Sequence, residues 1–334
     1  SVKSRGLGDV YKRQIKVSAY KDLTEKLYPA LDKLIIEIEK KEAAFKGIIK
    51  TGRTHLMDAM PIEVSQELSA WSSQLKNTKK TLVFLEKRLL EMPLGGTAVG
   101  TGINAHPRFA KTFAKELSTL MGGKCKAIAS ENFFHELSAQ DTAVQVSGEL
   151  KNLAVVLMKI SNDLRWMNSG PLAGLSEIEL KALQPGSSIM PGKVNPVIPE
   201  AVAMASADVI GNDVTITIAA QSGNFQLNVM LPVIAYNLLK SIALLTGSMK
   251  VLADKTIKSF KVNKKTLESV LNKNPILVTA LNPVIGYAKA AEIAKKAYKE
   301  NLPIIEVALE ETDLTRAQLN KYLDPKKLTK GGIK

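Results

Sequence analysis

The feature that most constrains this chain is the helical spacing of its apolar residues over long stretches. From Tyr20 to Lys46 they recur every three or four positions, at Leu23, Leu27, Leu31, Leu34, Ile35 and Ile38. Such spacing places one apolar stripe along a helix, with charged residues on the opposite face. It predicts a long amphipathic helix, in which Pro29 either produces a kink or marks the true first turn.

Similar patterns return along most of the chain. They predict helices from Pro61 through Trp71 towards Leu85, from Pro107 to Leu120, from Leu137 to Met167, from Glu200 to Ala220 and from Leu227 to Lys250. Aromatic residues make up only 5% of the chain, which favours helices packed on helices over aromatic-rich strands. No strand hairpin and no repeat is evident. The predicted fold class is all-α, a bundle of very long helices followed by a small helical domain.

Breaks in these patterns predict the domain organisation. Residues 1–14 have no amphipathic period and resemble translated sequencing-adapter read-through, so we expect them to be foreign to the natural chain. Residues 15–264 form the predicted central bundle domain and residues 265–334 the small C-terminal domain. In the latter, residues 313–315 are typical of a helix cap, with Leu319 and Tyr322 on the apolar side. Residues 175–185 are expected to be an exposed connection.

Composition excludes several classes of function. The net charge is +14, but the lysines are spread along predicted helices without interleaved aromatic residues, so no nucleic-acid partner is expected. The single cysteine, Cys125, excludes an internal disulfide and any zinc site built on several cysteines, and it fits a reducing cytoplasm. The three histidines lack metal-ligand spacing, so no metal is expected. No apolar run reaches the roughly 18 residues of a membrane span, and no membrane partner is expected.

The most informative segment for chemistry is the loop Gly186–Pro196, GSSIMPGKVNP. Its glycines let backbone N–H groups approach a ligand closely. Its serines supply hydroxyls, Lys193 a positive charge, and Asn195 both a donor and an acceptor. These groups suit a loop that holds a carboxylate or a developing negative charge. From residue types alone, an ordinary turn that caps the next helix is an equal alternative.

The whole string resembles the signature of the fumarase/aspartase superfamily. Three further segments also resemble this superfamily: TGRTHLMDAMP at residues 51–61, GGTAVGTGIN at residues 95–104 and GNFQLN at residues 223–228. A fourth, at residues 277–291, is similar to the fumarases. The resemblance extends from about Ile15 to the C-terminus.

The resemblance implies a role for each matching residue. Ser187 would be the base that removes the proton from carbon 3 of the substrate, stabilised by Lys193 and the loop amides. His55 would be the second acid/base group, which handles water, and Glu200 would pair with it. The remaining matches imply substrate-binding positions: Thr54, Ser188, Lys193, Val194 and Asn195.

Other candidate residues receive no role. His106 and His135 are interpreted as capping or surface residues, and Cys125 as an inert residue near a loop. The glycine-rich segment at Gly95 is not preceded by a predicted strand, so it is not a dinucleotide site, and close backbone packing near the active site is expected instead. No cofactor is implied.

Within the superfamily, His55 and Gly192 follow the fumarase pattern, because aspartases often carry glutamine and alanine there. Residues 197–200 resemble aspartases as much as fumarases, so aspartate ammonia-lyase stays the alternative, followed by other lyases of the superfamily. The implied reaction is the reversible anti addition of water to fumarate, giving L-malate, as in the tricarboxylic acid cycle. A structural role, as in lens proteins of the superfamily, is disfavoured by the intact Ser187, Lys193, His55 and Glu200.

The resemblance also implies a cytoplasmic homotetramer whose active sites draw residues from several subunits. The N-terminal domain of the family, with its substrate motifs, is not matched in this sequence. We therefore expect that an N-terminal domain is missing and that the chain as written is inactive, or nearly so, by itself.

Overall fold

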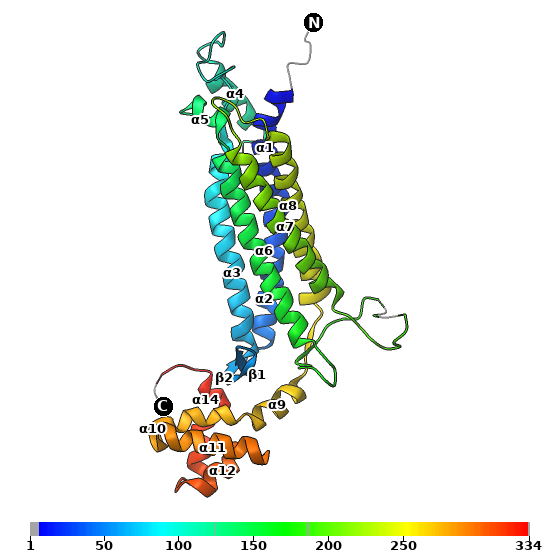
Figure 1. Cartoon of the computed structure of the whole chain (residues 1–334), viewed down its shortest axis with the longest axis vertical. Helices are drawn as coiled ribbons and strands as arrows, with labels where there is room; N and C mark the ends of the chain where they lie inside the picture. Colours follow the sequence, from blue (N-terminus) through cyan, green and yellow to red (C-terminus); the bar gives the residue numbers. More distant parts are fainter. Residues whose placement is uncertain (1–6, 124, 185, 187, 333–334) are drawn as a thin grey trace. The chain divides into compact units, whose positions relative to one another are not determined.

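Helices predominate in the part of the chain that the computed structural model describes, residues 7–123, 125–184, 186 and 188–332 (Figure 1). The strands in that part form three sheets of two strands each. The predicted all-α fold class is confirmed, with small strand pairs added. The predicted foreign segment extends into the first helix, which begins at Leu7, and its origin stays a prediction.

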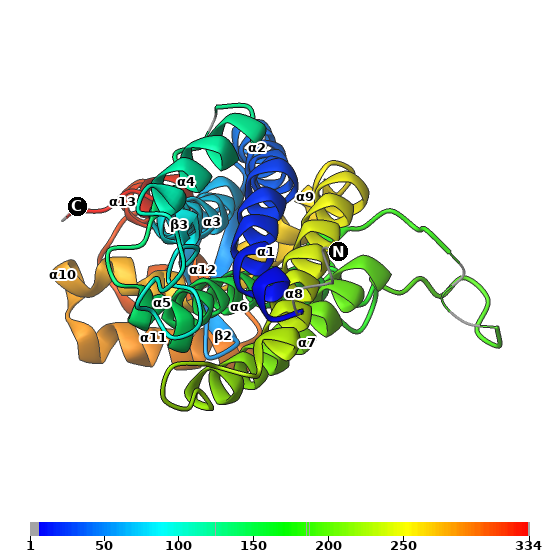
Figure 2. The same ribbon diagram turned by 90° about the horizontal axis from the view of Figure 1, so that it is seen from above.

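In the described part of the chain, the long helices of the bundle are α1 (Leu7–Asp22) with its continuation α2 (Tyr28–Ala44), α3 (Val64–Glu86), α6 (Asp141–Met167), α7 (Val197–Gln221) and α8 (Leu231–Val251). They run side by side in two perpendicular views (Figures 1 and 2), and α8 packs against both α1 and α7. Residues such as Leu150, Leu157, Ile234 and Leu238 are fully buried between them. The apolar periodicity therefore predicted α3, α6, α7 and α8 correctly, to within a few residues at their ends, whereas α1 begins at Leu7, well before the predicted start at Tyr20.

The first predicted helix is interrupted just before Pro29. The chain passes from α1 through a π-turn, η1 (Leu23–Leu27), into α2 (Tyr28–Ala44). The N–H of Tyr28 donates to the carbonyl of Leu23, one residue further back than in an α-helix. Pro29 has no N–H to donate to the preceding turn, so a disturbance of the helix at this point is confirmed.

A β-hairpin occupies the segment between α2 and α3, and the expectation that the chain has no hairpin was wrong. Strand β1 (Ile49–Thr54) pairs antiparallel with β2 (Met57–Glu63), with a bulge between Thr51 and Arg53. Pro61 lies in β2 opposite Thr51 rather than in the first turn of α3. A proline is tolerated there because the sheet has only two strands, and both are edges.

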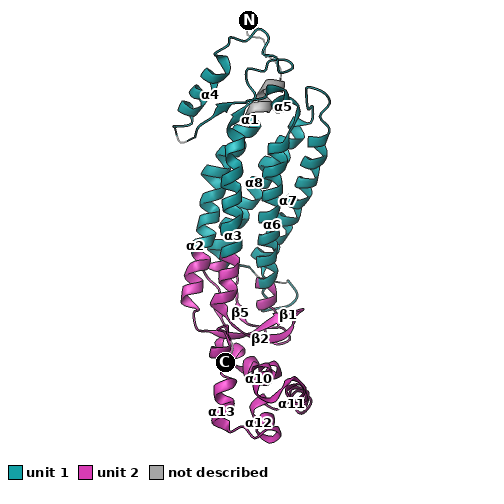
Figure 3. Ribbon diagram, turned by 90° about the vertical axis from the view of Figure 1, so that its left-hand side faces the viewer, with its two compact units in different colours: residues 1–36, 73–163, 183–256 teal, residues 37–72, 164–182, 257–334 magenta. Residues whose placement is uncertain are grey.

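The chain divides into two compact units (Figure 3). Unit 1 comprises residues 1–36, 73–163 and 183–256, and unit 2 comprises residues 37–72, 164–182 and 257–334. The predicted boundary between residues 264 and 265 falls inside unit 2, and as a domain boundary it stays a prediction.

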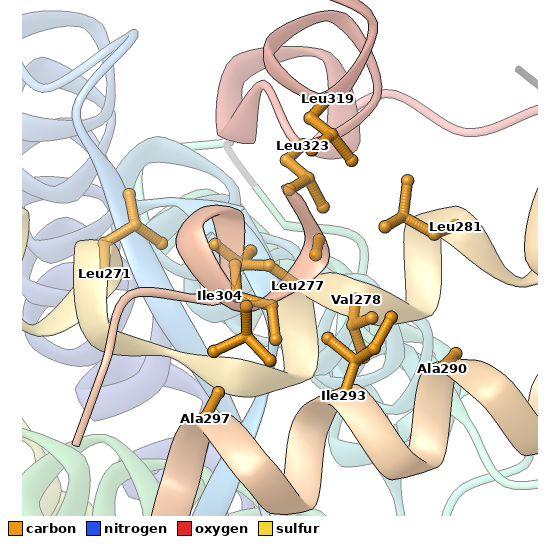
Figure 4. Packing of buried hydrophobic residues seen from close by; sticks show 12 residues of the cluster. Leu271, Leu277, Val278, Leu281, Ala290, Ile293, Ala297, Ile304, Leu319 and Leu323 are labelled. Carbon is orange, nitrogen blue, oxygen red and sulfur yellow. The ribbon is translucent and has the colours of Figure 1, made fainter. Parts of the chain in front are cut away.

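The C-terminal part of unit 2 consists of short helices: α9 (Lys264–Lys273), η4 (Pro275–Leu281), α10 (Asn282–Ile285), α11 (Tyr287–Glu300), α12 (Ile304–Glu311), α13 (Arg316–Tyr322) and α14 (Pro325–Leu328). They share one apolar core, which includes Leu277, Ile293, Ile304 and Leu319 (Figure 4). Thr315 caps α13 and forms a capping box with Gln318, which confirms the predicted cap. Several of these helices span only one or two turns.

Short elements complete the described part of the chain: η2 (Lys87–Leu90), β3 (Glu91–Met92), α4 (Phe109–Leu120), β4 (Ile128–Ala129), α5 (Phe133–Ser138), β5 (Ile178–Glu179), η3 (Leu252–Ile257) and β6 (Lys261–Val262). β3 pairs with β4, and β5 with β6. Residues 175–185 are not simply an exposed connection, since Glu177 and Ile178 are buried.

Two helices differ from the expectation that no apolar run is long enough to span a membrane. By length and composition, α7 and the continuous helix Leu231–Ile257 could both cross one, with mean hydropathies of 1.2 and 1.3. Both belong to the bundle, where α7 and α8 pack on each other. Core helices of soluble bundles have the same properties, so the pair is weak evidence for a membrane.

Candidate functional site

The predicted signature loop closes on itself between β5 and α7. The N–H of Gly186 donates to the carbonyl of Lys193 over 2.8 Å, and the side-chain amide of Asn195 donates to the carbonyl of Gly186 over 3.0 Å. The N–H of Lys193 donates to the carbonyl of Met190 over 3.2 Å. These bonds close the backbone of Gly186 onto residues 190–195 in front of α7.

Two glycines are required by this closure for different reasons. A Cβ atom on Gly186 would lie 2.4 Å from the carbonyl oxygen of Lys193, so only glycine lets the two backbone segments meet. Gly192 has a φ of +82° with open space around it, so its backbone conformation rather than crowding favours glycine there.

The side chains of the loop are mostly exposed. Ser188, Lys193 and Val194 are exposed, and Asn195 is half-buried. Glu200 lies in the first turn of α7 and is also half-buried. Ser187, the predicted base, lies outside the described residues. The loop therefore presents its cation and hydroxyl to the surroundings rather than packing them into unit 1.

Thr54 and His55 lie at the tip of the hairpin in unit 2. His55 and Leu56 are the two turn residues, with φ angles of +54° and +61°, and Thr54 pairs with Met57 on either side of them. All four residues are exposed. A two-residue hairpin turn requires left-handed backbone at both turn residues, a conformation that bulky side chains adopt rarely.

The structure groups the predicted site residues in two sets. Lys193, Asn195 and Glu200 lie in and after one loop of unit 1, and Thr54 and His55 adjoin in one turn of unit 2. The sequence did not single out Lys50, Arg53 or Glu177, whose side chains form ion pairs beside strand β1 of the hairpin. No sequence signal distinguished these charges from solvated surface residues, because their burial depends on the fold.

The other candidates keep the interpretation given from sequence. His135 contacts the carboxylate of Asp141 over 2.9 Å, and His106 accepts a bond from the N–H of Arg108. Cys125 is buried, and burial raises the pKa of its thiol, as expected for an unreactive residue. Among the described residues no cluster of three or more His, Cys, Asp and Glu side chains could hold a metal ion.

The glycine-rich segment is closely packed, as predicted. A Cβ on Gly95 would lie 2.7 Å from that of Ala110, and one on Gly100 would lie 2.6 Å from the ring of Phe134. Gly96 lies equally close to Phe133. The segment thus serves backbone packing against α4 and α5.

Comparison with known proteins gives two family matches. The model described as Lyase matches residues 3–211, and that described as Fumarase C C-terminus matches residues 277–330. Among curated proteins, "Fumarate hydratase class II 2" of Pseudomonas aeruginosa is 59% identical over 97% of this chain and 70% of its own length.

Solved structures of the same kind share the fold. The class II fumarase of Schistosoma mansoni superposes with a TM-score of 0.93 at 34% identity, covering 96% of this chain and 70% of that one. A "fumarate lyase:delta crystallin" from Brucella melitensis, in a structure bound to cobalt, gives 0.91 at 41% identity, covering 97% and 70%.

Proposed function

The chain belongs to the class II fumarate hydratase family, and we propose that Ser187, His55 and Glu200 are the residues that carry out its reaction. That reaction is the reversible addition of water to fumarate. In the hydration direction, the oxygen of water bonds to one carbon of the double bond and a proton bonds to the other, so that malate forms with no other reactant. The two additions take place on opposite faces of the double bond.

Each proposed acid/base group handles one of the two bonds. In the malate-to-fumarate direction Ser187, as the alkoxide, accepts the proton of carbon 3, and the hydroxyl of carbon 2 leaves as water with a proton from His55. Glu200 keeps the imidazole oriented and basic. After the proton leaves carbon 3, the adjacent carboxylate carries extra negative charge, which Lys193 and the loop amides stabilise.

The remaining residues of the site hold the two carboxylates of the substrate. Lys193 supplies a positive charge, Ser188 and Thr54 supply hydroxyls, Asn195 supplies an amide, and the backbone at Val194 lies within the same loop. The observation that carries this proposal is the closed loop of residues 186–195, whose cation and hydroxyl stay exposed. A loop that only capped α7 would have no need to present these groups.

The active assembly in this proposal is a homotetramer with active sites shared between subunits. Large apolar side chains stay exposed on the bundle helices of a single chain: Val155, Met204, Val214, Ile218 and Tyr236. Helices from other copies would cover them, and His55 of unit 2 would meet Ser187 and Glu200 of another copy. A large share of monomer at micromolar concentration in analytical ultracentrifugation would contradict this assembly.

The proposal includes a cytoplasmic location, no cofactor, and no partner other than the dicarboxylate substrate and further copies of the chain. The family chemistry moves only a proton and a hydroxyl, which side chains can handle. Salt-dependent association with arbitrary DNA would contradict the absence of a nucleic-acid partner.

The deciding experiment follows the ultraviolet absorbance of fumarate with and without ammonium. It is run on the 334-residue chain and on the extended chain, which we define as this chain preceded by the N-terminal segment of the Pseudomonas relative that comes before the matched region. Loss of fumarate without ammonium is expected. Loss only with ammonium would instead indicate an aspartase.

The same assay tests two narrower expectations. Full activity of residues 15–334 alone would contradict the predicted inactivity of the isolated chain. Ser187→Ala in the extended chain should raise the barrier by several kcal/mol, about the scale of a lost catalytic group. Near-normal turnover of that variant would show that another group is the base.

A further inference from the structure

Four charged side chains from three segments of unit 2 meet beside strand β1 of the hairpin. Lys50 Nζ lies 2.5 Å from one carboxylate oxygen of Glu177, and Arg53 Nη1 lies 2.5 Å from the other. Lys50 Nζ also lies 2.9 Å from the carboxylate of Glu67, in the first turn of α3. Strand β1 is thus tied both to α3 and to the segment that precedes β5.

The centre of this cluster is buried, and the cluster is electrically balanced. Lys50 is 2% exposed and Glu177 is 3% exposed. Two cations, Lys50 and Arg53, face two carboxylates, Glu67 and Glu177, so the formal charges cancel. A buried ion is strongly destabilising when it is left without its partner, so each member constrains where the others lie.

An irregularity of the hairpin lies beside this cluster. Between the pairs Thr51–Pro61 and Arg53–Asp58, Gly52 of β1 lies opposite two residues of β2, so the bulge belongs to β2. Lys50 and Arg53 are three residues apart on β1, and their side chains reach the two oxygens of the same carboxylate. Gly52 is required at the bulge, because a Cβ there would lie 2.6 Å from the carbonyl oxygen of Met60.

Glu177 is itself held by its backbone. Its N–H donates to the carbonyl of Met167 at the end of α6 over 2.8 Å, and its carbonyl accepts from the N–H of Asn263 over 2.9 Å. The side-chain amide of Asn263 also donates to the backbone carbonyl of Ser176 over 2.8 Å. The carboxylate therefore projects from a fixed point of the chain towards β1.

The residues that follow Arg53 are the proposed site residues Thr54 and His55. The tip that carries them is a turn of two successive left-handed residues, a conformation that bulky side chains adopt rarely and that the rest of the hairpin must impose. The ion pair at Arg53 lies one residue before Thr54 and fixes the strand at that point.

We propose that Glu177 is a positioning residue for the hydratase reaction: through Lys50 and Arg53 it sets the orientation in which the hairpin presents Thr54 and His55. The inference rests on the proposed function, since it assumes the roles given there to Thr54 and His55. Glu177 acts through the hairpin and does not touch the substrate.

The test compares Glu177→Gln with Glu311→Gln. Both glutamates belong to unit 2 and bridge two cations, but Glu311 pairs with Lys289 and Lys296 in the C-terminal helices. Amide hydrogen exchange of the 334-residue chain should become about tenfold faster or more in residues 49–63 with Glu177→Gln, and stay unchanged in α6. Glu311→Gln should leave residues 49–63 unchanged.

Kinetics of the extended chain give the second measurement. Glu177→Gln should lower kcat by about a hundredfold, the scale of a small misplacement of catalytic groups, with a smaller change in KM. Glu177→Asp, which keeps the charge, should recover part of this loss. If the Gln variant does not fold, amide exchange and steady-state kinetics are measured on Glu177→Asp and Arg53→Lys instead.

Three results in folded Glu177→Gln would each overturn the inference. The first is unchanged amide exchange in residues 49–63, and the second is a kcat within about twofold of the parent. The third is exchange that becomes equally faster throughout unit 2, which would mean that Glu177 holds the unit as a whole.

A parallel His55→Asn variant separates this inference from the proposed function. If His55→Asn keeps full activity, the proposed role of His55 fails, and the exchange data alone decide whether Glu177 holds the hairpin. If His55→Asn is inactive while Glu177→Gln leaves exchange unchanged, only the positioning inference fails.

Discussion

The hairpin of unit 2 and the signature loop of unit 1 use the same residue types in opposite ways. In the hairpin, Lys50 is buried and bound by two carboxylates. In the loop, Lys193 is exposed, and its backbone rather than its side chain closes the loop on Gly186. The hairpin is thus fixed by side-chain charges inside unit 2, whereas the loop is shaped by backbone bonds and leaves its charges available.

The difference bears on stability. A cation that is enclosed by its partners contributes to folding, because its removal leaves buried negative charge without full compensation. A cation that is presented to solvent contributes little to folding and can bind an anionic ligand. Substitutions in the hairpin cluster should therefore lower the free energy of unfolding, whereas Lys193 substitutions in the loop should change activity without changing stability.

The largest effect is expected from Lys193→Met in the loop. Loss of the charge that stabilises the substrate carboxylate should lower kcat/KM of the extended chain by about a thousandfold, or about 4 kcal/mol of barrier. The free energy of unfolding should change by less than about 0.5 kcal/mol, because the side chain is exposed. Urea unfolding at fixed protein concentration measures the free energy of unfolding, and the fumarate assay measures kcat/KM. Lys181→Met, at another exposed lysine, should change neither.

Lys50→Met in the hairpin should, unlike Lys193→Met, lower the free energy of unfolding. Glu177 keeps only Arg53 as a cation and Glu67 loses its partner, so the free energy of unfolding should fall by about 3 kcal/mol. The control is Lys33→Met, which removes an ion pair with Asp254 in which both side chains are largely exposed, and should cost under about 1 kcal/mol. Equal decreases in the free energy of unfolding for Lys50→Met and Lys33→Met would contradict the expected difference between buried and exposed lysines.

A third variant tests strain at the tip of the hairpin. Leu56 has a φ of +61° and is 63% exposed, so Leu56→Gly removes a conformational penalty and little packing. The free energy of unfolding should rise by up to about 1 kcal/mol. A decrease, measured by the same urea unfolding, would mean that Leu56 contributes more by packing than it costs in backbone strain.

The smallest effect concerns a glutamate that bridges two cations at the surface. Hydrogen bonds from Lys289 and Lys296 lower the pKa of Glu311 from 4.5 to about 2. Because the folded-state pKa is the lower one, the stabilisation is present above about pH 4.5 and is lost as the pH falls towards 2.

The difference in unfolding free energy between parent and Glu311→Gln should accordingly shrink as the pH is lowered through that window. It should also shrink in about 1 M salt, which screens exposed charges. The effect of Glu177→Gln should persist in the same salt, because that carboxylate is buried. If the loss of unfolding free energy in Glu311→Gln did not depend on salt, the Glu311 carboxylate would be as shielded from solvent ions as that of Glu177.

The two regions also differed in how far the sequence predicted them. The position of the loop before α7 was predicted correctly, because its glycines, prolines and polar residues are contiguous, while its role in the reaction stays a prediction. The hairpin was missed. Its turn residues are His55 and Leu56 rather than the Asn-Gly or Asp-Gly pairs that mark such turns, and Pro61 suggested the start of a helix. The side chains of His55 and Leu56 disfavour the left-handed backbone that the hairpin turn requires.

The sequence by itself determined the long helices, the cap at Thr315 and the close packing at Gly95, because spacing, capping and the absence of a side chain are local properties. Only the tertiary structure decided that Glu177 and Lys50 are buried together and that Lys50 and Arg53 reach the same carboxylate. The physical reason is that the environment of a charge depends on segments far apart in sequence. Glu177 and Lys50, separated by 127 residues, acquire their roles only when the chain brings them within a hydrogen bond of each other.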